Sequence, residues 1–427
     1  MPAKTKIIID TDPGIDDILA LLLALSGKAE EIEVLLISLT FGNVEVRSCL
    51  RNVVSMFHIM EREMLWRQEQ GRPPGFSALQ AHRPVVALGA EEPLQDQTML
   101  ADYFHGMDGL GGIHASHPHL TPAETWEHLF DPSADPHILK PVPTGIATGS
   151  FAHQSFIPSK RLAHEEILQT LRENEPGTVT LIAIGPMTNL ALAAAADPET
   201  FLRTKEVVVM GGAIGQPGNV TPVSEFNAYA DAVAAARVFA LTSPMPASTL
   251  PPSSSTEPLY PSKLSKELKL RLFSVDITER HSITKGQFQR TVSPFLEAGS
   301  PLAEWVGAFM AHAFRKLESM ELGHESDNVS LSLHDPICAW YALTADDARW
   351  RPTSASPEDI RIETSGQWTR GMCIVDRRNR QRIDSEVESS GDHGLWLSTR
   401  AGNRILRMDG SPGEDEFGGI LMEKIFA

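Results

Sequence analysis

The densest group of reactive side chains lies near the N-terminus, in Asp10-Thr-Asp12-Pro-Gly-Ile-Asp16-Asp17. Four carboxylates this close repel one another strongly unless a cation or shared protons neutralise them. A hard divalent cation with oxygen ligands is the natural solution. The alternative is purely local, with Asp16 and Asp17 stabilising a helix start and Asp10 capping a turn. The density of all four carboxylates together favours the cation site.

A second group, Ser332-Leu-His334-Asp335-Pro336, lies far along the chain. Alone it is a weak signal, because a histidine in a loop is most often structural. Paired with the first group, Asp335 would complete a carboxylate cage. His334 would then lie beside the cage as a proton donor.

A third group follows an apolar run in the middle of the chain. Gly211 and Gly212 permit close approach of the backbone to a ligand. Asn219, Glu225 and Asn227 carry side chains that can bind the hydroxyls of a sugar. There is no G-x-G-x-x-G here and no GK[ST] sequence anywhere, so a nucleotide phosphate site is not indicated. The alternative is a turn-rich loop without a ligand.

Two further features lie in expected loops. Residues 106–112 (GMDGLGG) have the composition of a mobile lid. The histidines His105, His114, His117 and His119 suggest a zinc site, but neither a cysteine nor an H-E-x-x-H sequence accompanies them. We therefore expect solvated loop histidines.

These groups fall where strands are expected to end. Lys6 to Asp10 predicts a buried parallel strand, TDPG a turn, and the sequence from Asp16 a helix. The alternation recurs, with strands expected in EVLLISLTFGN, RPVVALGA, TVTLIAI and EVVVMGGAIG and helices at about 46–60, in TNLALAAAA and in DAVAAARVFAL. This predicts an α/β fold whose mostly parallel central sheet is flanked by helices. Ligands bind beyond the carboxyl ends of such strands, where Asn43 and Asp12 are expected on one rim.

Composition limits the class of protein. The 427 residues are 42% hydrophobic and 22% charged, with a net charge of -18, which disfavours nucleic acids and anionic membranes as partners. Three cysteines without metal-ligand spacing are typical of a reducing compartment. The N-terminus lacks the apolar core of a signal peptide, and the longest apolar run, Ile18 to Leu25, is too short for a bilayer. A cytoplasmic protein is expected.

The domain organisation is expected to be one domain over residues 1–427 with additions to its surface. Segments 62–82, 113–160 and 246–266 lack periodicity or are rich in Pro, Ser and His, and strand–helix patterning resumes after each. They are interpreted as surface insertions. Residues from about 398 to 427 are interpreted as a loosely held tail.

In this order, the motifs resemble the nucleoside hydrolase family of the inosine–uridine preferring type. DTDPGIDD is the most specific match, and it is followed in family order by Gly42-Asn43, HGMDGLGG, IGPMTNLA, VMGGA, GN, EFN, HDP and IETSGQWTRGMCIVD. The resemblance covers most of residues 5–385. It implies a single α/β domain, one Ca²⁺ at the strand ends, a small-molecule nucleoside substrate and a homo-oligomer, dimeric or tetrameric.

The resemblance also implies residue roles. Asp12 would act as general base on a calcium-bound water, and His334 would donate a proton to the departing base. The calcium ligands would be Asp12, both oxygens of Asp17, the main-chain carbonyl of Ile184, and Asp335. The ribose would be held by Asp16, Asn43, Met210, Asn219, Glu225 and Asn227. Asp10 would support the ligands without touching the ion.

Such a site would hydrolyse the N-glycosidic bond of a ribonucleoside to free base and ribose. Cleavage passes through an oxocarbenium-like ribosyl cation, which carboxylates stabilise, while the metal lowers the pKa of water. A grip on both ribose hydroxyls predicts that deoxynucleosides are poor substrates. Single displacement by water predicts inversion at the anomeric carbon.

The preferred base stays open. His334 favours the branch of the family that includes uridine, because the purine-specific branch lacks this histidine and stacks the base on tryptophans. The base-contact segment 305–330 contains no tyrosine, which the pyrimidine branch usually supplies. His312, Phe314 or Arg315 is the expected substitute. Uridine, inosine, another purine nucleoside and nicotinamide riboside are all candidates.

Two other functions stay open. A haloacid-dehalogenase-type phosphatase would use Asp10 as nucleophile with Mg²⁺, but it needs a lysine and a later acidic pair, for which the sequence offers no convincing candidates in the right order. A protein of the same fold could also bind calcium and nucleosides without catalysis. All the motif acids are present, which favours the enzyme.

Overall fold

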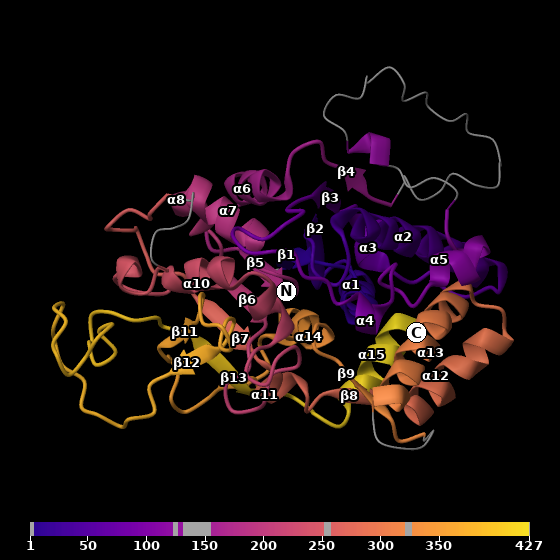
Figure 1. The fold of residues 1–427 in the computed structure, drawn as a ribbon. Coiled ribbons are helices and arrows are strands. Elements are labelled where there is room, and N and C mark those ends of the chain that lie inside the picture. Colours follow the sequence, from indigo (N-terminus) through magenta and orange to yellow (C-terminus); the bar gives the residue numbers. More distant parts are fainter. Residues whose placement is uncertain (1–3, 123–126, 131–154, 252–257, 321–326, 427) are drawn as a thin grey trace.

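The computed structural model describes residues 4–122, 127–130, 155–251, 258–320 and 327–426. Its centre is a nine-stranded sheet in the order β10-β13-β7-β6-β5-β1-β2-β3-β4 (Figure 1). Neighbouring strands run parallel except for the pair β10–β13. The strands are β1 Thr5–Thr11, β2 Ile32–Leu39, β3 Val85–Leu88, β4 Ile157–Pro158, β5 Val179–Ala183, β6 Glu206–Met210, β7 Leu270–Phe273, β10 Arg351–Pro352 and β13 Leu406–Gly410.

Smaller elements complete the β structure. Two short antiparallel pairs lie outside the main sheet, β8 Ser282–Thr284 with β9 Ser330–Ser332, and β11 Ile360–Ile362 with β12 Cys373–Val375. The expected α/β architecture with a mostly parallel sheet is therefore confirmed. The strands expected from KIIID, EVLLISLTFGN, RPVVALGA, TVTLIAI and EVVVMGGAIG are β1, β2, β3, β5 and β6.

Helices cover both faces of the sheet (Figure 1). The longer ones are α1 Ile15–Leu25, α2 Val46–Glu69, α6 Ala163–Glu173, α7 Thr188–Ala196, α10 Ala232–Ala240, α12 Lys285–Glu297, α13 Pro301–Met320, α14 Pro336–Thr344 and α15 Phe417–Phe426. Shorter helical segments are α3 Ser77–Ala81, α4 Asp102–His105, α5 Ile113–Ser116, η1 Pro118–Leu120, η2 Glu127–Leu129, α8 Pro198–Phe201, α9 Phe226–Ala230, η4 Pro246–Ser248 and α11 Val275–Thr278. No helix in the described part of the chain is both long and apolar enough to cross a bilayer.

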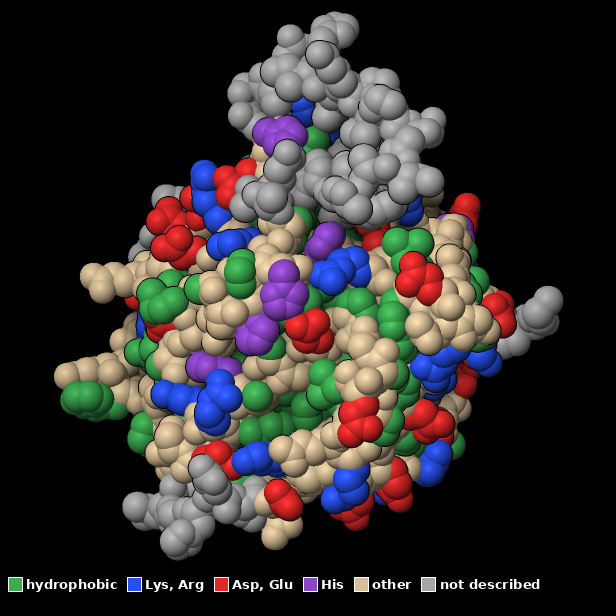
Figure 2. Space-filling view, turned by 90° about the vertical axis from the view of Figure 1, so that its right-hand side faces the viewer, with side chains coloured by type: hydrophobic (Ala, Val, Ile, Leu, Met, Phe, Trp, Pro, Cys, Tyr) green, Lys and Arg blue, Asp and Glu red, His purple; other side chains and the backbone are tan. Residues whose placement is uncertain are grey.

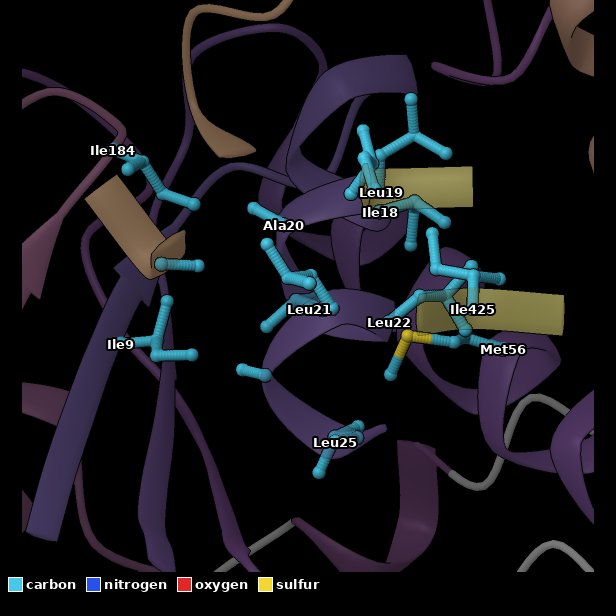
Figure 3. Packing of buried hydrophobic residues seen from close by; sticks show 14 of the residues in the cluster. Ile9, Ile18, Leu19, Ala20, Leu21, Leu22, Leu25, Met56, Ile184 and Ile425 are labelled. Carbon is cyan, nitrogen blue, oxygen red and sulfur yellow. The ribbon is translucent and has the colours of Figure 1, made fainter. Parts of the chain in front are cut away.

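Strand β1 shows why this sequence forms a two-faced sheet. Ile7 and Ile9 point into the core formed with α1, α2 and α14, whereas Ile8 points into the core formed with α6, α7 and α10. A strand buried on both faces needs a continuous apolar run rather than alternation, which is what KIIID provides. Figure 3 shows Ile9 and Ile184 beside the apolar side of α1, with Met56 and Ile425 packed on its other side.

The expected helix end near residue 60, ahead of segment 62–82, was wrong. Helix α2 continues to Glu69, well past the expected end near residue 60, and α3 follows within the same segment. The extension buries charge instead of apolar residues: Glu63 pairs with Arg67 at 2.8 Å and also accepts hydrogen bonds from Ser300 Oγ and Leu302 N. A search for hydrophobic periodicity cannot detect a buried helix face made of an ion pair.

The expectation of a loose tail was also wrong. Strand β13 lies inside the main sheet between β7 and β10, and α15 packs against α12. Phe417, at the start of α15, is fully buried and stacks on Trp340 with a centroid separation of 4.3 Å. Some of the glycines and acids that suggested a tail lie within these elements, such as Gly410 in β13 and Gly418 in α15.

The other two expected insertions are described only in part. In 113–160, residues 157–158 form β4, an edge strand paired with β3, so the insertion ends earlier than expected; residues 123–126 and 131–154 lie outside the described part. In 246–266, residues 252–257 lie outside it, and Tyr260 is buried under the guanidinium of Arg237 at 5.1 Å.

Replacing Phe417 by alanine tests whether the C-terminal helix is part of the core. The loss of a fully buried aromatic side chain should lower the free energy of unfolding by about 3–5 kcal/mol. Chemical denaturation measures it. The control is Trp368→Ala, since Trp368 is 78% exposed and its loss should change stability by about 0.5 kcal/mol or less. Equal effects of the two substitutions would contradict the packing described.

Candidate active site

The reactive groups meet at the carboxyl ends of neighbouring strands. Asp12 directly follows β1, Asn43 follows β2 and Ile184 follows β5, while Met210 is the last residue of β6. Because β6, β5, β1 and β2 are adjacent and parallel, these ends share one rim. Asp335 reaches the same rim from the start of α14, which packs on α1.

Asp12 is held tightly by backbone. Its Oδ2 accepts a hydrogen bond from Asn43 N at 2.6 Å. A Cβ atom at Gly42 would lie 2.0 Å from Oδ2, and one at Gly185 would lie 2.6 Å from Oδ1. Both glycines are therefore required for the two loops to approach this carboxylate.

The other carboxylate oxygen of Asp12, Oδ1, lies in a different environment. Oδ1 is buried and has no hydrogen-bond partner among the described residues. Burial and the neighbouring charge of Asp17 raise the pKa of Asp12 well above its ordinary value. A buried carboxylate oxygen without a partner is costly, and a cation or a polar ligand at this position would satisfy it.

Asp17 is oriented by four donors. Oδ1 accepts from Thr11 Oγ1 at 2.6 Å and from Asp12 N at 3.2 Å. Oδ2 accepts from Gly14 N at 3.0 Å and from Asn43 Nδ2 at 2.7 Å. The turn TDPG thus folds back on the start of α1 and fixes the carboxylate of Asp17. Asp17 therefore stabilises the helix start, which was the local alternative, and also belongs to the carboxylate cluster.

Three carboxylates converge at the start of α1. Asp16, Asp17 and Asp335 each offer an oxygen, and these atoms lie within 4.8 Å of one another. Burial, together with the charge of Asp17, raises the pKa of Asp16 to about 7, and burial with the charges of Asp16 and Asp17 raises that of Asp335 well above its usual range. Oxygen donors at this density fit a hard divalent cation. Asp12 lies outside this trio of oxygens but contributes the unpartnered Oδ1.

Asp10 lies behind the cluster. It accepts hydrogen bonds from Ser38 Oγ and, at 2.8 Å, from Asn189 Nδ2, and its main-chain carbonyl accepts from Ile184 N at 2.9 Å. Burial raises its pKa to about 7. Asp10 is therefore placed to orient the β1 and β5 ends rather than to meet a ligand.

A cavity of about 210 Å³ opens over this rim. It contains every residue expected to hold a ribose, namely Asp16, Asn43, Met210, Asn219, Glu225 and Asn227. It is also lined by Ile184, His334 and Asp335, whereas Asp12 and Asp17 are fully buried and do not line it. The cavity therefore brings together groups from the three motif clusters.

Two of these residues also maintain the rim itself. The carboxylate of Glu225 caps α9 by accepting from Asn227 N, and it accepts from Gly212 N at 2.8 Å. The Asn227 amide donates to the carbonyl oxygens of Ile184 at 3.0 Å and Met210 at 3.3 Å. The Ile184 carbonyl, expected as a metal ligand, is thus held in place from the β6 side.

The expectation of solvated histidines was wrong for two of the four. His105 is buried and lines the cavity, and its Nδ1 accepts from Ile15 N at 3.1 Å. A backbone N–H only donates, so a neutral His105 carries its proton on Nε2. Burial lowers the pKa of His105 to about 3, which keeps it neutral. The sequence did contain a signal for this place in the site, because His105 is the first residue of the HGMDGLGG motif.

His114 is also buried, with Nε2 2.7 Å from Asn52 Oδ1. The other two, His117 and His119, are partly or well exposed, and His119 pairs with Glu304 at 2.7 Å. Histidine side chains are visible together on the face drawn in Figure 2. The described residues include no cluster of these histidines that could hold a metal ion.

Part of the cavity lining is apolar or aromatic. It includes Tyr103 and Phe104 of α4 and Leu317 and Met320 of α13, and these two helices contact each other. The expected substitutes in segment 305–330 lie elsewhere: His312 contacts Phe104 O at 3.2 Å, and Phe314 and Arg315 line a separate groove. The tyrosine of this cavity comes from a different part of the chain, 102–105, which spacing within 305–330 could not reveal.

Comparison with known proteins agrees with this geometry. The model of the inosine-uridine preferring nucleoside hydrolase family matches residues 7–393. The chain is 30% identical to the uncharacterized protein C1683.06c of Schizosaccharomyces pombe, over 87% of this chain and 89% of that one. It is 29% identical to the pyrimidine-specific ribonucleoside hydrolase RihA of Salmonella paratyphi C, over 87% and 88%.

Solved structures show the same fold. A purine-preferring ribonucleoside hydrolase from Gardnerella vaginalis superimposes with a TM-score of 0.64 at 18% identity, over 99% of this chain and 98% of that one. The plant nucleoside hydrolase PpNRh1 superimposes with a TM-score of 0.62 at 19% identity, over 99% of each chain. With a family match over nearly the whole chain, this protein belongs to the inosine-uridine preferring nucleoside hydrolase family.

Proposed function

We propose that this chain hydrolyses the N-glycosidic bond of ribonucleosides, releasing free base and ribose. The observation that carries the proposal is one cavity in which carboxylates, side-chain amides and two histidines meet. The lining includes the polar side chains of Asp16, Asn43 and Asn227 and the larger side chains of Tyr103 and Met320. The polar side chains suit a sugar, and the apolar and aromatic ones suit a planar base.

In this proposal Asp12 takes the proton of the attacking water through Oδ1, the oxygen that has no partner of its own. Asp16 and Asn43 hold ribose hydroxyls, and the nearby carboxylates stabilise the positive charge that develops on the sugar. His334 faces the departing base; burial lowers its pKa to about 4, so its protonated form is a strong acid.

We also propose calcium as the cation. Asp12, Asp17, Asp335 and the Ile184 carbonyl would hold it. A bound Ca²⁺ would offset the repulsion among the carboxylates and lower the pKa of water in the cavity. Oxygen-only donors favour a hard cation over zinc.

The base preference we propose is of the uridine and inosine type, or broad. His105 and His334 line the same cavity as the apolar side chains and suit a base that accepts hydrogen bonds. Names of relatives point both ways, since one is pyrimidine-specific and another purine-preferring. The phosphatase alternative loses support because Asp10, its required nucleophile, is buried and bonded to Ser38 and Asn189.

Replacing Asp12 by asparagine tests the proposed general base. The kcat for the best of uridine, cytidine, inosine, adenosine, guanosine and nicotinamide riboside should fall about 10²–10⁴-fold, with the melting temperature maintained. Release of base and ribose is measured. Asp384→Asn, at an exposed carboxylate paired with Arg400, is the matched control and should keep full activity. Wild-type turnover that survives Asp12→Asn would refute the assigned role, and absence of turnover in calcium-loaded wild type would favour a binding protein.

Uridine and 2′-deoxyuridine test the proposed grip on the ribose. A site built to bond a hydroxyl leaves buried polar groups unpaired when that hydroxyl is missing. The kcat/KM for 2′-deoxyuridine should therefore be lower by about 10⁴-fold, measured as base release under identical conditions. A difference of less than tenfold would show that Asp16 and its neighbours do not bind the 2′-hydroxyl.

The pH dependence of calcium stabilisation tests the cation site. Asp16 lies beside the proposed ligands Asp17 and Asp335, with a carboxylate oxygen within 4.8 Å of theirs. Without a cation, it keeps its proton up to about pH 7 in the folded state but releases it near pH 4 when unfolded. Stability is therefore lost as pH rises from about 4 to 7, and a cation restores it only where the carboxylates are ionised. Calcium should raise the melting temperature by about 5 °C or more at pH 8 and by much less at pH 5.

Differential scanning calorimetry with excess calcium or with chelator gives both values. Asp335→Asn removes one of the three clustered carboxylates and should show a smaller gain at pH 8. A calcium effect that is equal at both pH values, or larger at pH 5, would contradict the site.

A further inference from the structure

The two nitrogens of His334 meet different surroundings. Its Nδ1 lies 2.7 Å from the hydroxyl oxygen of Thr278, and the ring lines the cavity. Thr278 is fully buried and is the last residue of α11. Neither the family motifs nor residue spacing singled out Thr278, because it lies in a segment distant in sequence from the His-Asp-Pro motif.

The backbone fixes this pair from both sides. Ser282 of β8 pairs with Ser332 of β9, and Leu333 N donates to His281 O at 2.7 Å. The start of α11 is anchored where Val275 N donates to Gly212 O at 2.9 Å. The residue after Leu333 is thereby held beside the end of α11.

The Thr278 hydroxyl is used differently from those of Thr291 and Thr344. Thr291 and Thr344 donate to the carbonyl four residues back, at 3.1 and 2.7 Å, a common local contact in helices. Thr278 Oγ1 instead contacts an imidazole that lines the ligand cavity.

A hydroxyl is a distinctive partner for a ring that exchanges a proton. It can donate to a bare Nδ1 or accept from a protonated Nδ1. The contact at Nδ1 therefore persists whichever form the ring takes, and Nε2 is left for the substrate. The hydrogen bond at one ring nitrogen sets the orientation and role of the other.

We propose that Thr278 is a positioning residue, which holds His334 with Nε2 toward the base so that the base leaves with a proton. The inference rests on the proposed function and deepens it. In the step, the C1′–N bond breaks and its electron pair goes to the base nitrogen, while a proton passes from Nε2 of the protonated imidazole to the base. The water oxygen bonds to C1′, and the water proton passes to Asp12.

The test compares two leaving groups in Thr278→Val. Uridine needs its base protonated, whereas 4-nitrophenyl riboside releases a stable anion that needs no proton. The kcat for uridine should fall about 10-fold or more with KM within about twofold of wild type, while kcat for 4-nitrophenyl riboside should stay within about threefold. Thr278→Ser, which restores a hydroxyl, should recover most of the uridine activity. Thr291→Val, which loses a helical threonine hydroxyl outside the cavity, is the matched control and should leave both substrates unaffected.

The outcomes separate the inference from the proposed function. Equal loss on both substrates would mean that Thr278 only supports the fold, and no loss on uridine would mean that His334 does not depend on it; either overturns the inference while hydrolysis stands. If uridine is not cleaved, the best purine nucleoside takes its place, and wild-type protein that cleaves none of these substrates would overturn the proposed function itself. If Thr278→Val does not fold, Thr278→Ala removes the same hydroxyl without added bulk, and the same comparison is made with it.

Discussion

The mutual repulsion of carboxylates gathered at one rim of the sheet is the constraint on which the rest of the site depends. Asp12, Asp17 and Asp335 are buried, and Asp16 faces the cavity beside them. Burial raises the pKa of all four carboxyls, and neighbouring carboxylate charge adds to the rise for Asp12, Asp16 and Asp335. The chain offsets part of this cost with donors such as Asn43 N and Gly14 N, but Asp12 Oδ1 keeps no partner among the described residues. A cation at this rim is the simplest neutralising agent.

The fold brings these carboxylates together because the carboxyl ends of adjacent parallel strands lie at one edge of the sheet. β1 contributes the acidic turn, β2 contributes Asn43 and β5 contributes the Ile184 carbonyl. Glycines at 42 and 185 allow the loops to close on Asp12 without a clash. The cavity above is lined by both polar and apolar side chains, so the same scaffold offers contacts for a sugar and for a base.

The strand–helix alternation and the three motif clusters could be predicted from the sequence because each depends on local pattern. The buried strand KIIID and the acidic turn were recognisable from residue type alone. The prediction failed for the second half of α2, where the buried face is the Glu63–Arg67 ion pair rather than apolar residues. It also failed for β13 and α15, short elements that pack against parts of the chain distant in sequence. It also failed for Tyr103, whose place in the cavity follows from the position of α4 rather than from spacing within 305–330.

A calcium titration of chelator-treated protein, with bound ion and uridine cleavage measured on the same samples, tests the central claim most directly. The account predicts that one ion binds per chain and that turnover rises in proportion to its occupancy. Full turnover in protein that holds no divalent ion would contradict this claim, because the buried carboxylates would then support catalysis without a bound cation.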